Sequence, residues 1–557
     1  MKRGRPSLSG WFAWASLTFL VVLAFALRLY RLGELPPGLS PDEALNGVQA
    51  TEALHSGRFH VFYPENGGRE GLMIALQALS FALAGISSVT LRLPGALLGA
   101  LSVAGVFLVT RKMAGFFLAG RPAGGSLDPN AFALLTAFFV ATSHWHVNFS
   151  RTAFRGILDP FFSPLALFVL VSALERRAVR WFALAGGITG LGLYGYSSHR
   201  FLLFPILALL FLDAARHGQG LAAAVAGRLR DRGWWAFAAC AATAAAPLLH
   251  VAITQPAQFF ARARSVSVLA AERPWHEFKL SAGAAALQFF TRGDTNWRHN
   301  IAGQPALPAI LAISFATGLL LIVLSWAPAP LRRLHGSFGE PIGRMLTALR
   351  RWVPPELGAV LAVWLLAMLL PAALTREGRP HFLRSIGAIP PAYAMAALGI
   401  LAIFRATAVS LPGRLGTDLR LLATGALTAL LFRGTYIDYF LRWGRDPGPG
   451  VYFHAYAFEH ASWIDALPRD VEKYVVCNWC LGGEREVHRA WEFQPVVFYT
   501  RTETEAARRT KGVRYLRRQE LGALKYSEAP RHFFLAECPR ELIEKEILAK
   551  SPNAVIR

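Results

Sequence analysis

The chain has 557 residues, of which 54% are hydrophobic and only 17% are charged. This composition, with a mean hydropathy of +0.35, excludes a soluble protein of this length, because a soluble fold needs more charged surface. The net charge of +23 would suggest nucleic-acid binding in a soluble protein. Here much of the basic charge lies in short segments between apolar runs. We therefore expect contact with membrane lipids and no nucleic-acid partner.

The apolar residues form runs long enough to cross a membrane, which takes about 20 residues in a helix. We predict a polytopic α-helical membrane protein with about 11 transmembrane helices. They cover residues 11–27, 89–110, 131–147, 157–174, 181–196, 201–212, 234–254, 306–327, 357–374, 385–404 and 420–432. The first run is not expected to be a cleaved signal peptide, because Arg28, Leu29, Tyr30 and Arg31 follow it instead of small residues.

Basic residues predict the orientation, since they concentrate on the cytoplasmic side. A cytoplasmic N-terminus makes every inside segment basic. These segments are 111–130, 175–180, 213–233, 328–355 and 405–419. The predicted localisation is thus a multi-pass protein of the cell membrane with an extracytoplasmic C-terminal domain.

The first outer segment, 28–88, should contain two helices. One covers 42–55, because Pro41 precedes it, Asp42 and Glu43 occupy its first turn, and Gly57 follows its end. The other covers 71–86 and is expected to lie along the membrane surface. A membrane span there would reverse every later loop.

The tail after residue 440 changes character. Residues 444–450 read as a linker, and strands are predicted at 474–476, 495–499 and 532–536, with a charged helix after Pro539. The predicted domains are therefore a membrane domain over 1–440 and a small extracytoplasmic α/β domain over 441–557.

Four cysteines are too few for a disulfide scaffold. Cys477 and Cys480 have metal-ligand spacing, with His488 and Cys538 downstream, but the set fits no common zinc pattern. A disulfide or free thiols are favoured, and neither a catalytic metal nor a cofactor is expected.

Polar residues gather in the outer segments, where ionisable groups at membrane depth are costly and so suggest function. Each group also has a structural interpretation: a helix cap, a loop or an interfacial anchor. The groups are Ser40–Glu43, Asn66–Glu70, Ser143–Asp159, Tyr194–Arg200 and Gly293–Asn300.

These groups place carboxylates among arginines and histidines on one face of the membrane. Guanidinium groups bind phosphate oxygens, and a neighbouring carboxylate can act as a general base. The combination favours chemistry on a phosphorylated lipid at the outer surface.

The ordered set of motifs resembles the bacterial branch of the protein mannosyltransferase-like GT-C glycosyltransferases (families 39 and 83), which includes the aminoarabinose transferase of lipid A and the RgtA/B/C/D-like enzymes. The resemblance covers about residues 10–440. It depends on Asp42-Glu43 with the preceding Leu27–Leu32, on Trp145–Arg151 with Arg155, on Tyr196–Arg200, and on Arg298-His299-Asn300 with Pro305.

This resemblance implies a GT-C fold and the transfer of a hexosyl or pentosyl group from a polyprenyl-phosphate donor to a protein, lipid or glycan acceptor in the cell envelope, with inversion. It assigns the catalytic role to Asp42, with Glu43 as a neighbour that orients it. The residues that it suggests for substrate binding are Arg69, His146, Arg151, Arg155, Asp159, Arg200, Arg298 and His299.

The first outer loop departs from the aminoarabinose transferases. Their Lys-Pro-Pro-Leu motif is replaced here by Gly68-Arg69-Glu70-Gly71-Leu72, so their specificity does not carry over, and Arg69 would supply the positive charge.

Two other functions are compatible with many spans and buried charge. A secondary transporter or lipid flippase is the main alternative, but such proteins often have repeated halves and broken helices, which this sequence does not suggest. A protein that only binds or assembles an envelope polymer would not need Asp42.

Overall fold

The computed structural model describes residues 10–121, 126–216, 220–326, 352–410, 413–478, 480 and 486–557. Most of the predicted inside segment 328–355 lies outside the described residues. So do parts of the predicted inside segments 111–130, 213–233 and 405–419.

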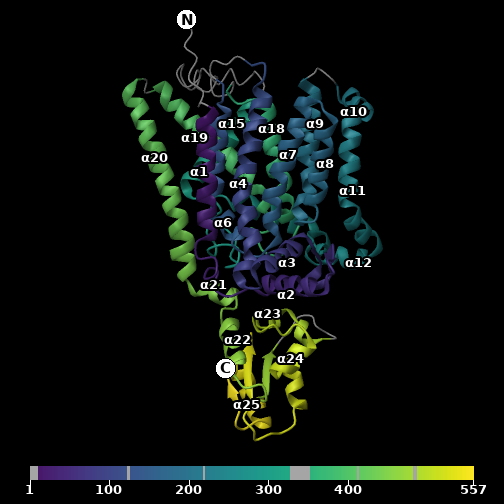
Figure 1. Cartoon of the computed structure of the whole chain (residues 1–557). Coiled ribbons are helices and arrows are strands. Elements are labelled where there is room, and N and C mark those ends of the chain that lie inside the picture. Colours follow the sequence, from purple (N-terminus) through teal and green to yellow (C-terminus); the bar gives the residue numbers. More distant parts are fainter. Residues whose placement is uncertain are drawn as a thin grey trace. The chain divides into compact units, whose positions relative to one another are not determined.

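Long apolar helices make up most of the described chain, which confirms the predicted polytopic membrane fold. Among the described residues, nine helical stretches are long and apolar enough to cross a membrane. Figure 1 shows most of them running nearly parallel to one another. They are α1 (Gly10–Leu29), α4 (Ser88–Leu118), α7 (Leu158–Arg176), α9 (Leu203–Arg216) with the preceding 3-10 turn η3 (Ser197–Leu202), α11 (Arg232–Thr254), α15 (Ala309–Trp326), α18 (Pro355–Ala373), α19 (Ile389–Ser410) and α20 (Arg414–Tyr436).

Shorter helices connect them. These are α5 (Pro129–Ala141), α6 (His144–Ser150), α8 (Val179–Gly192), α10 (Leu221–Arg230), α12 (Pro256–Phe259), α13 (Ala261–Val266) and α14 (Pro274–Leu287).

The predicted span 131–147 is wrong as one continuous helix. Helix α5 ends at Ala141 after 13 residues, and α6 begins at His144. The break follows from two hydroxyl groups: Thr142 donates to the Phe138 carbonyl at 2.9 Å, and Ser143 Oγ accepts the His146 N–H at 3.1 Å. The second bond has the geometry of a helix cap, so an apolar run alone could not reveal the interruption.

The chain divides into two compact units. Unit 1 contains residues 1–30, 95–150 and 155–439, and unit 2 contains residues 31–94, 151–154 and 440–557. The first outer segment therefore shares a unit with the C-terminal tail. The predicted division into a membrane domain over 1–440 and an extracytoplasmic domain over 441–557 stays a prediction.

The first outer segment of unit 2 folds much as predicted. Helix α2 (Pro41–Ser56) ends at Gly57, whose φ of +66° suits glycine. The hairpin β1 (Phe62–Tyr63) and β2 (Arg69–Glu70) follows, and Gly67 and Gly68 in its turn both have positive φ. Helix α3 (Leu72–Ala84) is apolar but only 13 residues long, and its place on the membrane surface stays a prediction.

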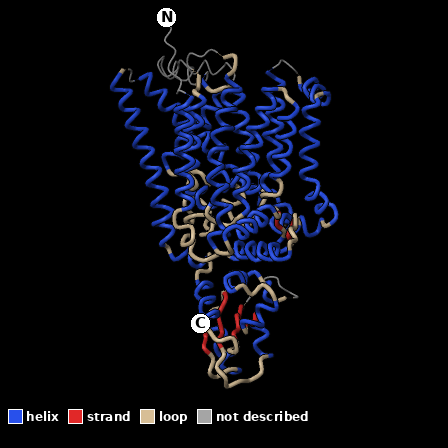
Figure 2. Tube along the Cα trace, viewed as in Figure 1, coloured by secondary structure: helices blue, strands red, loops and turns tan. Residues whose placement is uncertain are grey.

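The tail contains a parallel four-stranded sheet, which confirms the predicted α/β fold. Its strands lie in the order β4–β3–β5–β6, and Figure 2 shows them in red among the tail helices. The strands are β3 (Lys473–Cys477), β4 (Val513–Arg517), β5 (His532–Ala536) and β6 (Val555–Ile556). The helices are α21 (Pro447–Tyr452), α22 (Tyr456–Ala466), α23 (Gln494–Thr500), α24 (Glu505–Lys511) and α25 (Arg540–Lys550).

Two expectations for the tail are wrong. Residues 495–499 form part of α23 and not a strand, and Pro495 occupies the first turn of this helix. The helix is buried on nearly all sides, so its sequence is as continuously apolar as that of a central strand. The predicted linker 444–450 is largely helical, because Asp446 caps α21 by accepting the Gly448 N–H at 2.8 Å. Cys477 and Cys480 form a disulfide, which settles the alternative left open by the sequence.

Successive side chains of β3 point to opposite faces of the sheet and belong to two apolar cores of unit 2. Tyr474 and Val476 face a small core with Ile543 and Ile547 of α25. Val475 and Cys477 belong to a larger core that also takes in residues of α2, α3 and α23. Because one core joins the first outer segment to the sheet, both must lie on the same side of any membrane.

This shared core makes a prediction about topology. In a variant without the native free cysteines, Glu34→Cys and Glu528→Cys should both react with a membrane-impermeant maleimide on intact cells, since both positions are exposed. Arg230→Cys, exposed in a predicted inside segment, should react only after the cells are permeabilised. Labelling of the first two from opposite sides would contradict the shared core.

Candidate active-site residues

Asp42 lies in the first turn of α2, where a carboxylate is stabilised by the helix dipole. Its Oδ1 accepts a hydrogen bond from the Asn66 amide and one from the Trp491 indole, the latter at 3.3 Å. Asn66 belongs to the hairpin turn and Trp491 to the tail. Both of these donors are neutral and orient the carboxylate. The Asp42 side chain is partly exposed.

Glu43, the next residue, has a different environment. Its side chain is fully buried and forms an ion pair with the equally buried Arg92, Oε1 to Nε at 3.1 Å. The same oxygen accepts the Ala153 N–H at 2.9 Å. Its Oε2 accepts both the N–H and the hydroxyl of Ser40 at 3.1 Å, which completes a capping box. These contacts fix the start of α2, so Glu43 acts on Asp42 by holding its backbone.

Arg92 extends this network to the segment before α2. Its guanidinium donates to the carbonyl oxygens of Pro36 at 2.9 Å and Gly38 at 2.5 Å. The Glu43–Arg92 pair therefore joins the beginning of α4 and residues 36–40 to α2. One feature of the sequence could have identified Arg92 as structurally important: it is a charged residue inside a predicted membrane span.

Arg69 and Arg151, two of the predicted phosphate-binding residues, are in the same unit as Asp42. Arg69 is buried and donates to Asn46 and, at 2.5 Å, to Gln49, both on α2. Arg151 is fully buried, donates to the Leu35 carbonyl at 3.1 Å and lies over the Phe440 ring. Unit 2 thus brings together Asp42, Glu43 and these two arginines.

The remaining predicted residues belong to unit 1. His146 is fully buried, and Arg28 donates to its Nδ1 at 2.8 Å. Because arginine has only donors, the proton of a neutral His146 is on Nε2, which donates to Ser102 at 2.9 Å. Sequence reasoning did not identify Arg28 as this partner, although it is a charged residue at the end of an apolar run.

Asp159 lies at the start of α7 and is buried. It accepts hydrogen bonds from Ser198 and from His199 Nδ1, the latter at 3.3 Å. These contacts join two of the polar groups seen in the sequence, Ser143–Asp159 and Tyr194–Arg200. Arg155 lies over the Tyr196 ring and Arg200 over the Phe259 ring, at 5.5 and 5.0 Å from the centroids.

The fifth polar group folds around Asp294. Its Oδ1 accepts the Asn296 N–H, and its Oδ2 accepts the Phe382 N–H and His299 Nδ1, each at 2.8 Å. Burial raises the pKa of Asp294, but the interactions with His299 outweigh it and lower that pKa to about 2. Arg298 donates to the Asn296 side chain through its backbone N–H at 2.9 Å.

Asp294, His299 and His381 are the residues best placed to hold a metal. One ligand atom from each lies within 4.8 Å of the others. Burial lowers the pKa of His381 well below its usual range, which favours the neutral form that binds cations. The carboxylate already accepts three hydrogen bonds from the protein, so the cluster is stabilised by its own contacts. The expectation that catalysis needs no metal stays a prediction.

Residues 72–249 match the sequence model of the family described as dolichyl-phosphate-mannose-protein mannosyltransferase. The match covers about a third of the chain, which is similar to that family over this region. The matched region contains His146, Arg151, Arg155, Asp159 and Arg200, whereas Asp42 precedes it. No curated protein sequence matches the chain.

Several solved structures resemble this chain at 14% sequence identity. ArnT from Cupriavidus metallidurans, crystallised with undecaprenyl phosphate, has a TM-score of 0.46, with 89% of this chain and 85% of that one covered. The Archaeoglobus fulgidus oligosaccharyltransferase, in complex with zinc and sulfate, has a TM-score of 0.47, with coverage of 91% and 68%. The mycobacterial arabinofuranosyltransferase AftD has a TM-score of 0.40, with coverage of 85% and 31%.

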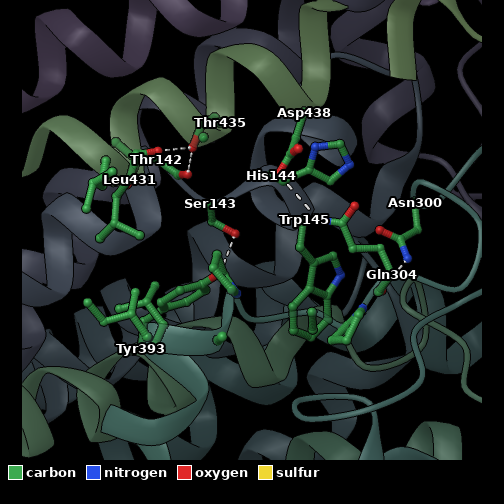
Figure 3. Close-up of a pocket in the computed structure, with 18 of the residues that line it drawn as sticks. Thr142, Ser143, His144, Trp145, Asn300, Gln304, Tyr393, Leu431, Thr435 and Asp438 are labelled. Atoms are coloured by element: carbon green, nitrogen blue, oxygen red, sulfur yellow. Dashed lines mark hydrogen bonds between the residues drawn. The ribbon is translucent and has the colours of Figure 1, made fainter. Parts of the chain in front are cut away.

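Unit 1 also contains a cavity of about 210 Å³, which sequence reasoning did not identify. We call it the Trp145 cavity. It is bounded by the break between α5 and α6, the loop before α15, and the end of α20. Figure 3 shows Asp438, His144 and Gln304 at one end and Leu431 and Tyr393 at the other. Only the tertiary structure brings these segments together.

The Glu43–Arg92 pair yields a stability prediction. Glu43→Gln or Arg92→Met should each lower the free energy of unfolding by about 3–5 kcal/mol, because each leaves a buried charge without its partner. The double variant should lose less than the sum of the two. Thermal unfolding in detergent would measure the effects. Glu34→Gln, which breaks an exposed pair with Arg31, should change stability by about 1 kcal/mol at most and is the control.

Asp294 yields a pH prediction. Its folded-state pKa of about 2 is below the unfolded value of about 3.9. Ionised Asp294 therefore adds stability above about pH 4, and this contribution disappears as the pH falls from about 4 to about 2. The melting temperature of Asp294→Asn should be lower than that of the wild type at pH 7, and the difference should shrink in acid. A difference that is constant with pH, as expected for the exposed control Glu272→Gln, would contradict the pairing.

Proposed function

We propose that this protein transfers a sugar from a polyprenyl-phosphate donor to a protein, lipid or glycan acceptor at the extracytoplasmic face of the membrane, with inversion and with Asp42 as the general base. The observation that carries the proposal is the contrast between two adjacent carboxylates. Glu43 is fully buried and paired with Arg92, whereas Asp42 is partly exposed and accepts hydrogen bonds from Asn66 and Trp491.

The donor class is supported by the matched family, whose description names a dolichyl-phosphate sugar. In such a donor the leaving group is a phosphate, which departs with little help from an acid. The protein then needs positive charge near the phosphate and a base near the acceptor hydroxyl.

Arg69 and Arg151 are the candidates in the unit of Asp42, although both already bind backbone or side-chain oxygens. Arg155, Arg200 and Arg298 are candidates through the resemblance alone.

The reaction proposed for Asp42 is a single displacement. Its carboxylate takes the proton from the acceptor hydroxyl as that oxygen attacks the anomeric carbon, and the bond to the lipid phosphate breaks on the opposite side. Attack from the opposite side inverts the anomeric configuration. The fixed start of α2 supports this role, because a general base must be within hydrogen-bond reach of the proton that it removes.

The test of this proposal is Asp42→Asn, which keeps the size of the side chain but removes its basicity. Expression and membrane insertion should be unchanged, and transfer should fall by about 10² to 10⁴-fold, the usual contribution of a general base. The assay follows radiolabel from a polyprenyl-phosphate sugar to another molecule in isolated membranes. Glu34→Gln, an exposed carboxylate of the same unit, is the control.

Transfer by Asp42→Asn at the wild-type rate would refute the assignment of the base. If the wild type moved label across the membrane without attaching it to another molecule, the protein would be a transporter or flippase instead.

A further inference from the structure

The Trp145 cavity has a lining of unusual chemistry for a protein that handles lipid phosphates. Its polar groups are hydroxyls, carboxamides, an imidazole and one carboxylate. They come from Thr142, Ser143, His144, Asn300, Gln304, Thr435 and Asp438. No lysine or arginine is among the described residues that line it.

This lining disfavours a phosphate group. Phosphates in proteins are held by guanidinium or ammonium groups or by helix N-termini, whereas Asp438 would repel them. The same lining suits a neutral molecule with several hydroxyl groups, because carboxylates and amide oxygens accept hydrogen bonds from hydroxyls, and amide N–H groups donate to them.

Hydrogen bonds within the protein fix the side chains at the polar end of the cavity. Asp438 lies in η7 (Ile437–Arg442), a π-helical turn that directly follows α20; such turns are rare and often occur at functional sites. Its Oδ2 accepts a hydrogen bond from Gln304 at 3.3 Å. Asn300 donates to the Gln304 carbonyl at 2.6 Å and to the Asp294 carbonyl at 3.1 Å, so the Asp294 cluster supports this loop.

The opposite end has a larger apolar share. Figure 3 shows Leu431 and the ring of Tyr393 there, with Thr142 and Thr435 beside Leu431, and Leu430, Ile310 and Leu311 also line the cavity. An aromatic or aliphatic wall beside hydrogen-bonding groups is a frequent design for small-molecule sites. Here it can accept the C–H face of a sugar ring and the first carbons of an apolar substituent.

We propose that the Trp145 cavity binds the sugar ring of a glycoside, with its hydroxyls toward Asp438 and Gln304 and its apolar substituent toward Leu431. The proposal deepens the proposed function and rests on it for the biological source of the sugar. The cavity binds the hydroxylated ring, and any phosphate bonded to that ring would lie outside the cavity.

The glycine Gly434 provides a direct test. It lines the cavity, and an added Cβ there would meet no atom within 4 Å. Gly434→Leu should therefore fill the cavity without a clash, and it should not destabilise α20, because leucine is a better helix former than glycine. Gly425→Leu on the same helix is the matched control, because an added Cβ at Gly425 also meets no atom within 4 Å and Gly425 is not part of the lining.

The probes are short glycosides that match one another in chain length. The full-length protein in lipid nanodiscs would be titrated with hexyl glycosides of several neutral sugars and with hexyl phosphate, and binding would be followed by saturation-transfer NMR. At least one hexyl glycoside should bind, and hexyl phosphate should bind at least about tenfold more weakly. Gly434→Leu should lose glycoside binding by about tenfold or more, and Gly425→Leu should keep it.

A second variant tests the polar end. Asp438→Asn should weaken glycoside binding by about tenfold, the usual effect of a lost charged hydrogen bond, while Asp418→Asn, exposed on the preceding helix α20, should not. Equal binding of glycosides and hexyl phosphate, or wild-type affinity in Gly434→Leu, would overturn the proposal.

A competition experiment tells whether the bound sugar ring belongs to the donor or to the acceptor. Displacement of the hexyl glycoside by the polyprenyl-phosphate sugar would assign the cavity to the donor sugar, and simultaneous binding would assign it to the acceptor. These measurements need no catalysis, so glycoside binding to a protein that transfers no sugar would refute the proposed function while leaving the cavity assignment intact.

Discussion

The buried ion pair between Glu43 and Arg92 is the contact on which the organisation of unit 2 depends. Both side chains are fully enclosed, and together they bind the start of α2, the segment 36–40, Ala153 and the beginning of α4. Such a pair adds little stability compared with apolar residues but is costly to break. What it provides here is position, because Asp42 precedes Glu43 directly and inherits its fixed backbone.

A second theme is the use of interrupted helices. The break at residues 142 and 143 and the π-helical turn after α20 both leave irregular backbone beside a cavity. In a membrane protein such irregular backbone is tolerated only where the protein or water satisfies it. Ser143 accepts a bond from Tyr393 at 2.7 Å, and the Thr142 carbonyl accepts one from Thr435. The interruptions therefore supply both the shape and the polar groups of the Trp145 cavity.

Unit 2 links the predicted catalytic segment to the α/β tail through one apolar core. Val475 of β3, Val48 of α2 and Phe81 of α3 belong to the same cluster, and Trp491 of the tail donates to Asp42. Changes in the tail can therefore reach the carboxylate proposed as the base through packing and through one hydrogen bond. This gives the tail a physical route by which it could influence the reaction.

The sequence alone determined the membrane class, most of the spans, helix α2, strands β3 and β5 and the candidacy of Asp42, because these depend on local signals: hydrophobic length, capping residues and charge at a helix start. Local signals did not separate Asp42 from Glu43, which only the family resemblance distinguished, since adjacent acids look alike until burial and partners are known. The sequence also misassigned α23, whose burial on nearly all sides hides its helical period. The pairing of Glu43 with Arg92, the Asp294 cluster and the Trp145 cavity were decided only by tertiary structure, because each joins residues far apart in the chain.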